Sequence, residues 1–354
     1  MKTEVVIDDE IKLSCRNIWK VYGAEPQKFF KVNRQGFDDP KKLTKVISES
    51  GHIVAAANVS FDVHVGEIFV IMGLSGSGKS TMVRCLSRLV EPNAGKVLLD
   101  GEDLLKKNGT QLTEIRRHKM GMVFQNFGLM PHLNVIENIA FPLKLQGVTK
   151  SDRFEQAARV IELVGLAGRE TNFPKELSGG QQQRVGIARS LAVEPDVWFL
   201  DEPFSALDPL IRKQMQNEFL RIQALKKKTV IFITHDFQEA LRIADRMAIM
   251  RDGTIVQIGR PVDLILNPAD EYIRDFTYDV PWESVLRAAD IATTSSVKSI
   301  NLPEVSGSTP VAKLLPLLAR SKSGVIVVGD DGVPVGVATA RSFVEALASA
   351  ETPN

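Results

Sequence analysis

The stretch GLSGSGKST, residues 73–81, stands directly after the apolar run EIFVIM, residues 67–72. Its side chains are too small to fill a hydrophobic core, and a lysine among them is poorly placed for burial. The order matches G-x-x-x-x-G-K-[ST], in which backbone N–H groups of a glycine-rich loop surround phosphate oxygens at the start of a helix. The stretch therefore predicts a strand, a phosphate-binding loop and a helix.

The loop residues have distinct expected roles. Lys79 is predicted to reach the β and γ phosphates of a nucleotide, and the Ser80 hydroxyl to ligate Mg²⁺. The other residues expected to line the phosphates are Gly73, Ser75, Gly76, Ser77, Gly78 and Thr81. A strand-to-helix turn that binds nothing is the weaker alternative.

An acidic pair follows a second apolar run, VWFLDE, residues 197–202. Asp201 is expected to hold Mg²⁺ through water, and Glu202 to polarise the attacking water. Two acids at the end of a strand are common, and alone they would leave an ordinary structural role equally open. Together with the glycine-rich loop they predict phosphoryl transfer.

Composition narrows the class of protein. The 354 residues include 44 Lys and Arg against 43 Asp and Glu, so the net charge of +1 gives no electrostatic argument for nucleic acid or an anionic membrane surface. Cys15 and Cys85 lack metal or C-x-x-C spacing, which favours a reducing compartment. No signal pattern and no apolar run of about 18–20 residues is present, so we expect a cytoplasmic protein that reaches a membrane through a partner.

Apolar runs of strand type alternate with helical patterns, which predicts an α/β fold with a parallel sheet. Helices are expected over residues 79–92 and 179–195, because each pattern runs into a proline. Serine, threonine, proline and glycine become frequent after about residue 267. We place a domain boundary near Val280, giving domains over 1–279 and 280–354.

The stretch LSGGQ, residues 177–181, opens one of these helices. It is a second helix start suited to phosphate, although the first loop already supplies a full cradle, so it implies a second molecule. Here the chain resembles the ATP-binding cassette family, in which this motif of one subunit closes over ATP held by the other. The resemblance extends over about residues 13–278.

The resemblance implies a P-loop NTPase fold with a RecA-like core, an antiparallel β subdomain and a helical subdomain. Gln125 in MVFQ matches the family's Q-loop, which is linked to metal, water and the transmembrane partner. Asp208 in SALD matches the dimer-contact loop, and His235 in ITHD matches the histidine that contacts the γ phosphate. In isolation, His235 could equally be a strand-end histidine satisfied by local hydrogen bonds.

Other positions carry nucleotide contacts by the same resemblance. Tyr22 matches the aromatic residue that stacks on adenine, with a packed strand residue as the alternative. The residues expected to face the nucleotide of the opposite subunit are Ser178, Gly179, Gly180 and Gln181.

Three stretches narrow the resemblance to ATPase subunits of glycine betaine, proline and other quaternary-amine importers: residues 66–104, 121–143 and 204–220. An insertion at about 24–53 also matches these subunits. The resemblance implies an ATP- and Mg²⁺-dependent homodimer that works with transmembrane permease subunits and a periplasmic solute-binding protein. It places the chain on the cytoplasmic face of the inner membrane, with glycine betaine, proline betaine, choline, carnitine and trimethylamine oxide all open as solutes.

The tail, about residues 286–347, resembles one cystathionine-synthase-type (CBS) motif in a small α+β domain. Helix, strand, D-D-G turn, strand and helix are expected in that order. Such motifs work in pairs, which implies a regulatory or dimerising contact with a second copy. The nucleotide-binding version has Asp three residues after a Thr, whereas Ser342 follows Thr339 here, so adenosine binding is not implied.

Three other functional classes fit the sequence less well than an importer subunit. A soluble cassette protein of DNA repair or translation would carry paired cassettes, zinc insertions or long coiled coils, and the sequence has none of these signals. A sensor with a vestigial ATPase would have lost catalytic residues, yet Glu202 and His235 are present. Exporter cassettes are commonly fused to membrane spans, for which the sequence has no signal.

Overall fold

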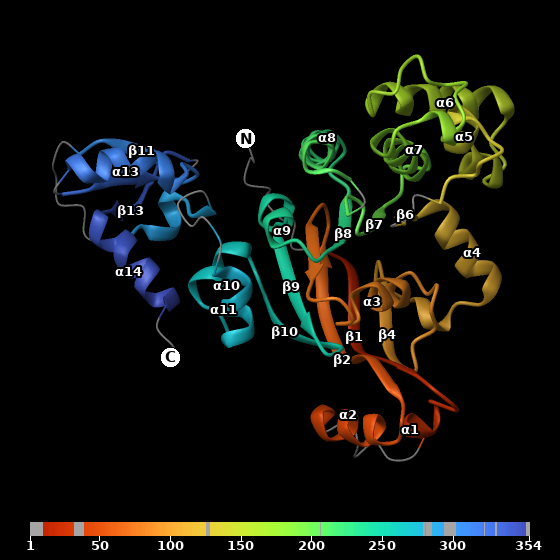
Figure 1. Cartoon of the computed structure of the whole chain (residues 1–354), viewed down its shortest axis with the longest axis horizontal. Coiled ribbons are helices and arrows are strands. Elements are labelled where there is room, and N and C mark those ends of the chain that lie inside the picture. The colour runs from red at the N-terminus through yellow and green to blue at the C-terminus, as the bar shows by residue number, and fades with distance from the viewer. Residues whose placement is uncertain are drawn as a thin grey trace. The chain divides into compact units, whose positions relative to one another are not determined.

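The computed structural model describes residues 10–31, 39–124, 128–205, 207–278, 280, 285–293, 302–321, 323–329 and 331–351. By its internal packing the chain divides into two compact units, Met1–Val256 and Gln257–Asn354 (Figure 1). The sequence places this boundary near Val280. The difference arises because Val262 and Leu266 pack against the hydrophobic core of the second unit.

A mostly parallel sheet forms the centre of the first unit. Among the described residues its strand order is β10-β9-β3-β8-β7-β6. The strands are β3 (Ile68–Met72), β6 (Met120–Val123), β7 (Val197–Asp201), β8 (Thr229–Thr234), β9 (Arg246–Arg251) and β10 (Thr254–Gly259). Every residue of β3, β7 and β8 is buried, which explains their continuous apolar sequences. The parallel register of β3 with β8, and of β8 with β7, brings their carboxyl ends to one edge.

An antiparallel sheet stands beside this core, with the order β2-β1-β4-β5 in the described part of the chain. Its strands are β1 (Ile11–Tyr22), β2 (Ile53–His64), β4 (Ala94–Leu99) and β5 (Glu102–Asp103). The short η2 (Leu104–Lys106) follows. Cys15 on β1 and Cys85 are free and buried, and burial raises the pKa of each thiol to about 12.

The insertion between β1 and β2 forms two helices, α1 (Lys28–Lys31) and α2 (Pro40–Glu49). Asp39 caps α2, and Pro40 suits its first turn because proline needs no backbone donor there. Ile47 of α2 packs with Trp19 and Val21 of β1 in a small separate core. The insertion is therefore anchored to the antiparallel sheet.

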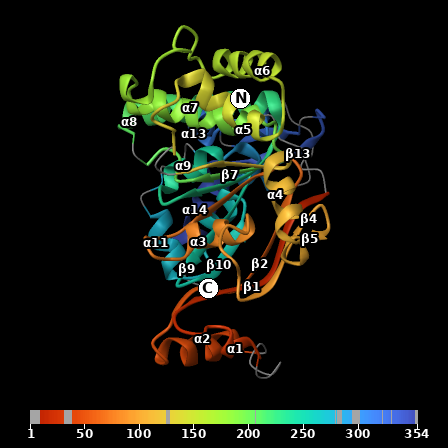
Figure 2. The same cartoon turned by 90° about the vertical axis from the view of Figure 1, so that its right-hand side faces the viewer.

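Helices surround the two sheets of the first unit (Figures 1 and 2). They are α3 (Lys79–Leu86), α4 (Gly109–His118), α5 (Val135–Leu145), α6 (Lys150–Leu163), η3 (Pro174–Glu176), α7 (Gly179–Ala192), α8 (Pro209–Lys226) and α9 (Phe237–Ile243). Helices α5, α6 and α7 pack on one another as a helical subdomain. The prediction that the first helix reaches Pro92 is wrong, since α3 ends at Leu86 and Arg88 adopts a left-handed φ of 53°.

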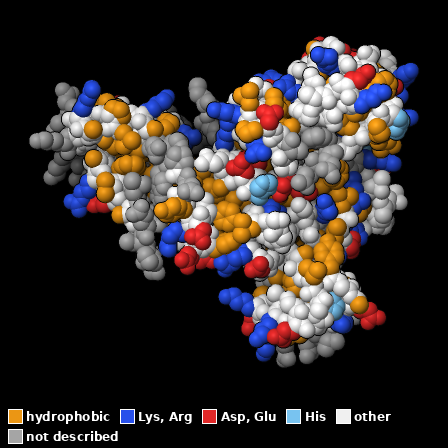
Figure 3. Space-filling view, in the orientation of Figure 1, with side chains coloured by type: hydrophobic (Ala, Val, Ile, Leu, Met, Phe, Trp, Pro, Cys, Tyr) orange, Lys and Arg blue, Asp and Glu red, His pale blue; other side chains and the backbone are white. Residues whose placement is uncertain are grey.

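The second unit is a small α+β body. It contains α10 (Pro261–Leu266), α11 (Glu271–Thr277), η4 (Ala288–Ile291), β11 (Glu304–Ser306), α13 (Val311–Arg320), β12 (Val325–Val328), β13 (Pro334–Ala338) and α14 (Ala340–Glu351). Strand β12 pairs parallel to β11 and antiparallel to β13. Figure 3 shows hydrophobic side chains gathered on the face of this unit turned to the viewer. Among the described residues of the whole chain, no helix is long and apolar enough to cross a membrane.

Candidate nucleotide site

The glycine-rich loop leaves β3 through backbone conformations that require glycine. Gly73 and Gly78 have φ values of 152° and 99°. A Cβ at Gly73 would lie 2.2 Å from the Met250 carbonyl oxygen, and one at Gly78 would lie 2.0 Å from the Ala55 carbonyl oxygen. Both positions therefore exclude any side chain, and the loop keeps its backbone groups accessible.

Lys79 lies inside this loop. Its Nζ donates to the carbonyl oxygens of Gly73 and Leu74, each at 2.9 Å, and the residue is only 5% exposed. Burial lowers the pKa of the Lys79 ammonium, while the charges of Glu202 and Asp201 oppose that shift. The loop thus concentrates one positive charge where phosphate oxygens would be held.

Ser77 and the neighbouring loop residues also fit an anion. Ser77 is 5% exposed, and its buried Oγ has no hydrogen-bond partner among the described residues. Ser75 and Gly76 are exposed, and Gly78, Ser80 and Thr81 are partly buried. A buried hydroxyl without a partner is costly, so this side chain suits a loop that receives an external acceptor.

Ser80 and Asp201 are joined by a hydrogen bond between their side chains. Ser80, on the first turn of α3, donates its hydroxyl to Asp201 Oδ1 at 2.9 Å. Asp201 ends β7 and is 2% exposed, and this burial raises the pKa of its carboxyl. A hydroxyl and a carboxylate are hard oxygen donors of the kind Mg²⁺ prefers beside substrate phosphates. Among the described residues, no three His, Cys, Asp or Glu side chains gather to hold a metal by themselves.

Glu202 and His235 meet at the same edge of the sheet. His235 Nδ1 lies 3.1 Å from Glu202 Oε2, and the Glu202 side chain is 16% exposed against 55% for His235. Glu202 has a left-handed φ of 45°, and its N–H donates to the Ile233 carbonyl oxygen at 3.1 Å. A strained backbone of this kind is common at functional sites.

The LSGGQ stretch begins α7. Ser178 caps this helix: the Ser178 N–H donates to Gln181 Oε1 at 2.9 Å, and Ser178 Oγ accepts from the Gln181 N–H at 3.3 Å. Ser178 and Gly179 are exposed. A Cβ at Gly180 would lie 2.7 Å from Ile211 Cγ2. Figures 1 and 2 both draw α7 beside α5 and away from α3, so this motif and the glycine-rich loop sit on different parts of the unit.

The remaining predicted residues are spread over the unit. Asp208 caps α8, where its Oδ1 accepts from the N–H groups of Leu210 and Ile211 at 3.1 and 3.0 Å. Tyr22 ends β1 and is 41% exposed, with Lys20 Nζ 4.8 Å from its ring centroid. Gln125 lies outside the described residues.

Arg84 is an additional charge that sequence reasoning missed. Its Nη2 lies 3.8 Å from Asp201 Oδ2. The only available signal is its position four residues after Ser80, which places both on one face of α3.

Comparisons with known proteins identify the family. The ABC transporter family matches residues 56–205. The chain is 48% identical to the trimethylamine N-oxide transport system ATP-binding protein TmoW of Pelagibacter ubique, over 96% of this chain and 98% of that protein. The chain is 50% identical to TmoW of Ruegeria pomeroyi, over 96% of this chain and 97% of that protein. The chain is also 45% identical to ProV of Salmonella typhimurium, a glycine betaine/proline betaine transport system ATP-binding protein. That match covers 96% of this chain and 84% of that protein.

A solved structure supports the same assignment. The dimeric structure of MJ0796, a bacterial ABC transporter cassette, matches with a TM-score of 0.59 and 31% identity, over 70% of this chain and 98% of that one. The sheet, the glycine-rich loop and these relatives together define an ATP-binding cassette. The chain belongs to the ABC transporter family, among the ATP-binding subunits of transport systems.

The family assignment confirms several predictions from the sequence. The cassette fold, ATP as ligand and ATPase activity are confirmed. The alternative of a DNA-repair or translation ATPase is not favoured, because the full-length relatives are transport-system subunits.

Proposed function

We propose that two copies of this chain hydrolyse ATP to drive import of a small methylated amine through a membrane permease. The observation that carries this proposal is the match to trimethylamine N-oxide transport subunits at 48% and 50% identity over 96% of the chain. The chain is also 45% identical to a betaine transport subunit, so the proposed class of solute includes quaternary amines. The chain would act on the cytoplasmic face of the membrane, held there by the permease.

In this proposal each site residue acts on ATP in a defined way. Lys79 neutralises the β and γ phosphates after releasing the carbonyl oxygens of its own loop. Ser80 and Asp201 would hold Mg²⁺, which when bound lowers the negative charge on the phosphates. Glu202 orients the attacking water, and His235 beside it contacts the γ phosphate.

The second copy completes each site. Ser178, Gly179, Gly180 and Gln181 would close over ATP held by the partner, and Asp208 would help form the contact between copies. The placement of Ser178 to Gln181 at the start of α7, away from α3, supports this division. The dimeric MJ0796 cassette gives a precedent for two cassettes in one assembly.

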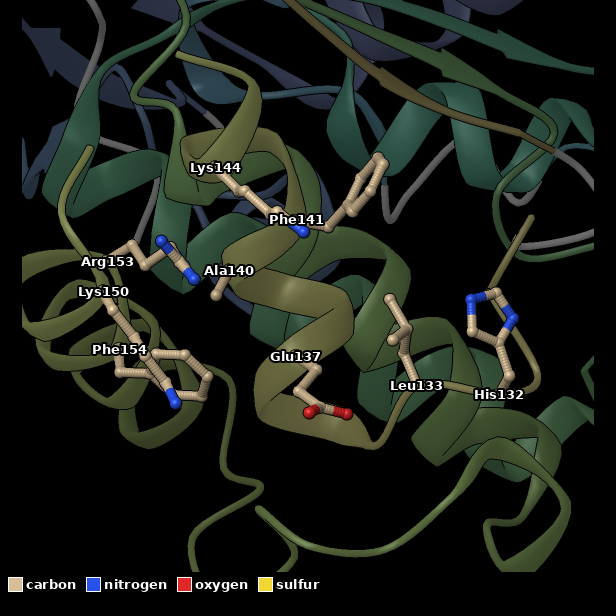
Figure 4. A pocket seen from close by; sticks show the side chains of 9 residues that line it. All are labelled: His132, Leu133, Glu137, Ala140, Phe141, Lys144, Lys150, Arg153 and Phe154. Atoms are coloured by element: carbon tan, nitrogen blue, oxygen red, sulfur yellow. The ribbon is translucent and has the colours of Figure 1, made fainter. Parts of the chain in front are cut away.

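A cavity between α5 and α6 is suited to binding a cytoplasmic segment of the permease. Its volume is about 350 Å³, and it is lined by His132, Leu133, Glu137, Ala140, Phe141, Lys144, Lys150, Arg153 and Phe154 (Figure 4). The Lys150 Nζ and Arg153 Cζ lie 5.9 and 5.6 Å from the centroid of the Phe154 ring. Glu137 is engaged in capping α5. Aromatic walls with basic side chains suit an apolar segment that carries an acidic residue, as a cytoplasmic permease loop would offer.

The solute class is tested in the assembled transporter. The chain, its permease and the solute-binding protein are reconstituted in proteoliposomes, and uptake is measured for trimethylamine N-oxide, glycine betaine, proline betaine, choline and carnitine. We expect ATP-dependent uptake of at least one of them, with a matching rise in ATP hydrolysis. Hydrolysis that no member of this panel stimulates, beside active uptake of a chemically different solute, would contradict the solute class while leaving the ATPase assignment intact.

A further inference from the structure

Hydrogen bonds between polar side chains connect helices α8 and α9, beginning next to His235. We call this set the α8–α9 ladder; its members are Arg212, Gln216 and Asn217 on α8, and Asp236, Glu239 and Arg242 at the start of or within α9. Arg212 pairs with Asp236, the residue that directly follows His235. Its Nη1 lies 3.3 Å from Asp236 Oδ2.

Arg212 also holds the loop that leads into α8. Its Nη2 donates to the carbonyl oxygens of Ser205 and Leu207 at 3.4 and 3.3 Å. The Ser205 hydroxyl in turn donates to the Glu202 carbonyl oxygen at 3.0 Å. One guanidinium therefore connects the backbone at Ser205 and Leu207 to Asp236, the residue that directly follows His235.

The other members of the α8–α9 ladder connect α9 to α8 through hydrogen bonds. Gln216 Nε2 donates to Glu239 Oε1 at 3.0 Å, and Arg242 Nη1 donates to Gln216 Oε1 at 3.2 Å. Arg242 Nη2 also donates to Asn217 Oδ1. Glu239 and Gln216 are 4% and 6% exposed. Because a buried polar network with paired members resists distortion, a shift of one helix end is passed to the other.

Asp236 links the α8–α9 ladder to the backbone beside His235. Its Oδ1 accepts from the Glu239 N–H at 3.1 Å, and its own N–H donates to Thr234 Oγ1 at 3.0 Å. The backbone on both sides of His235 is thus fixed, and the His235 ring lies 3.1 Å from Glu202 Oε2.

We propose that Arg212 is a positioning residue that couples Ser205 and Leu207, in the loop that leads into α8, to His235. This inference rests on the proposed function, in which that loop meets the second copy and His235 meets the γ phosphate. Arg212 Nε is buried and has no hydrogen-bond partner in the described part of the chain, so the terminal nitrogens alone hold the charge. The Arg212 and Asp236 side chains are only 30% and 31% exposed, so a shift of the loop away from Asp236 would weaken a partly desolvated ion pair.

The test uses purified full-length chain and steady-state ATP hydrolysis. Arg212→Ala should lower kcat about tenfold or more and change KM for ATP less than about twofold, since it disturbs positioning and leaves the phosphate loop intact. The kcat of Arg212→Lys should lie between the values for Arg212→Ala and the unsubstituted protein. One ammonium group cannot bind both the loop carbonyl oxygens and the Asp236 carboxylate. Asp236→Asn keeps the size of the side chain and its capping oxygen but removes the charge, and it should reproduce the kcat loss.

The matched control is Arg221→Ala. Arg221 lies on the same helix and pairs with Glu218, away from the ladder. Its kcat should stay within about twofold of the unsubstituted protein. Thermal unfolding of each variant identifies any loss of fold, and Asp236→Asn remains informative if Arg212→Ala unfolds.

A double-substitution cycle decides whether Arg212 acts through His235. The pair Arg212→Ala with His235→Ala should be no slower than His235→Ala alone. Rate losses that multiply, or an Arg212→Ala kcat equal to that of the unsubstituted protein, would overturn the inference. Glu202→Gln serves as the separate check on the ATPase mechanism: if it also hydrolyses ATP normally, the proposed site roles fail and not only the role of Arg212.

Discussion

Asp201 and Glu202 are neighbours in the chain but have different surroundings. Asp201 completes the buried strand β7 and accepts from Ser80, whereas Glu202 leaves the strand with a left-handed φ of 45° and faces His235. The left-handed turn at Glu202 ends the strand there, so the Glu202 side chain is directed by the turn and not by the alternation of β7. One is suited to holding a cation and the other to orienting water.

The residue-scale prediction follows from this separation. Glu202→Gln keeps the size of the side chain but removes the charge that orients water, so the turnover of ATP should fall by about 10²-fold or more while ATP binding survives. Lys79→Ala should instead weaken ATP binding, because it removes the charge that faces the phosphates. Hydrolysis rates and binding of a fluorescent ATP analogue measure both effects. A Glu202→Gln variant with normal turnover would falsify the assigned role.

Sequence reasoning located side chains that belong to contiguous motifs. Lys79, Ser80, Asp201, Glu202 and His235 all lie where strands β3, β7 and β8 end, as the apolar runs before them indicated. It missed Arg212 because two of the acceptors of Arg212 are backbone carbonyl oxygens, which leave no trace in a sequence. It also missed the 3.8 Å approach of Arg84 to Asp201, which depends on how α3 packs beside β7.

At the scale of elements, the helix starts were more predictable than the helix ends. Helices α4, α5 and α7 each begin with a reciprocal capping box, at Asn108, Asn134 and Ser178. These patterns are local and can be read directly from the sequence. The early end of α3 was not predictable from its apolar spacing, because the left-handed turn at Arg88 falls on an ordinary residue. Arg88 is held there by hydrogen bonds to the carbonyl oxygens of Leu104 and Lys107, which are distant in the chain.

The cavity between α5 and α6 carries the element-scale prediction. Arg153→Glu reverses a charge on its wall and should weaken docking of an acidic permease segment, so solute uptake by the reconstituted transporter should fall about tenfold or more. Hydrolysis of ATP by the isolated chain should change little, because none of the residues that line the cavity belongs to the glycine-rich loop or to the Asp201–Glu202 pair.

The control for this prediction is Arg159→Glu on the same helix. Arg159 is exposed and pairs with Glu155 rather than lining the cavity. Uptake equal to that of the unsubstituted transporter is expected for Arg159→Glu. Equal losses in the two variants would show that α6 tolerates no added acid, and would remove the argument for docking at the cavity.

At the scale of the whole molecule, the second unit has its own core. Leu286, Val311, Leu314 and Val325 are fully buried within it. Its strand and helix order agrees with the single CBS-like motif expected from the sequence, but the motif itself stays a prediction. Thr339 and Ser342 cap each other at the start of α14, each N–H donating to the other's hydroxyl at 2.9 Å. Whether this unit binds a nucleotide stays untested.

Pairing of this unit with its counterpart in a second copy remains our proposal. Val333, Val335 and Val344 are 57%, 48% and 60% exposed. Val335 lies on β13, which ends the strand order β11-β12-β13 in the described part of the unit. Exposed apolar side chains at such a strand favour contact with another surface. A contact of this kind would change with salt where charged groups surround it, since screening acts over about 10 Å.

The last prediction tests this contact in the full chain, because α10 belongs to the second unit and packs on its core, which a truncation after Val280 would uncover. Val335→Glu places a charge in the exposed apolar group, so the salt dependence of solute uptake should shift while ATP hydrolysis by the isolated chain stays within about twofold. Ala312→Glu adds the same charge to the exposed side of α13 and should leave the salt curve unchanged. Uptake into proteoliposomes across a salt series gives the comparison. Superimposable curves for all three proteins would rule out a salt-sensitive contact at Val335, because a valine buried in such a contact cannot be replaced by a carboxylate without cost.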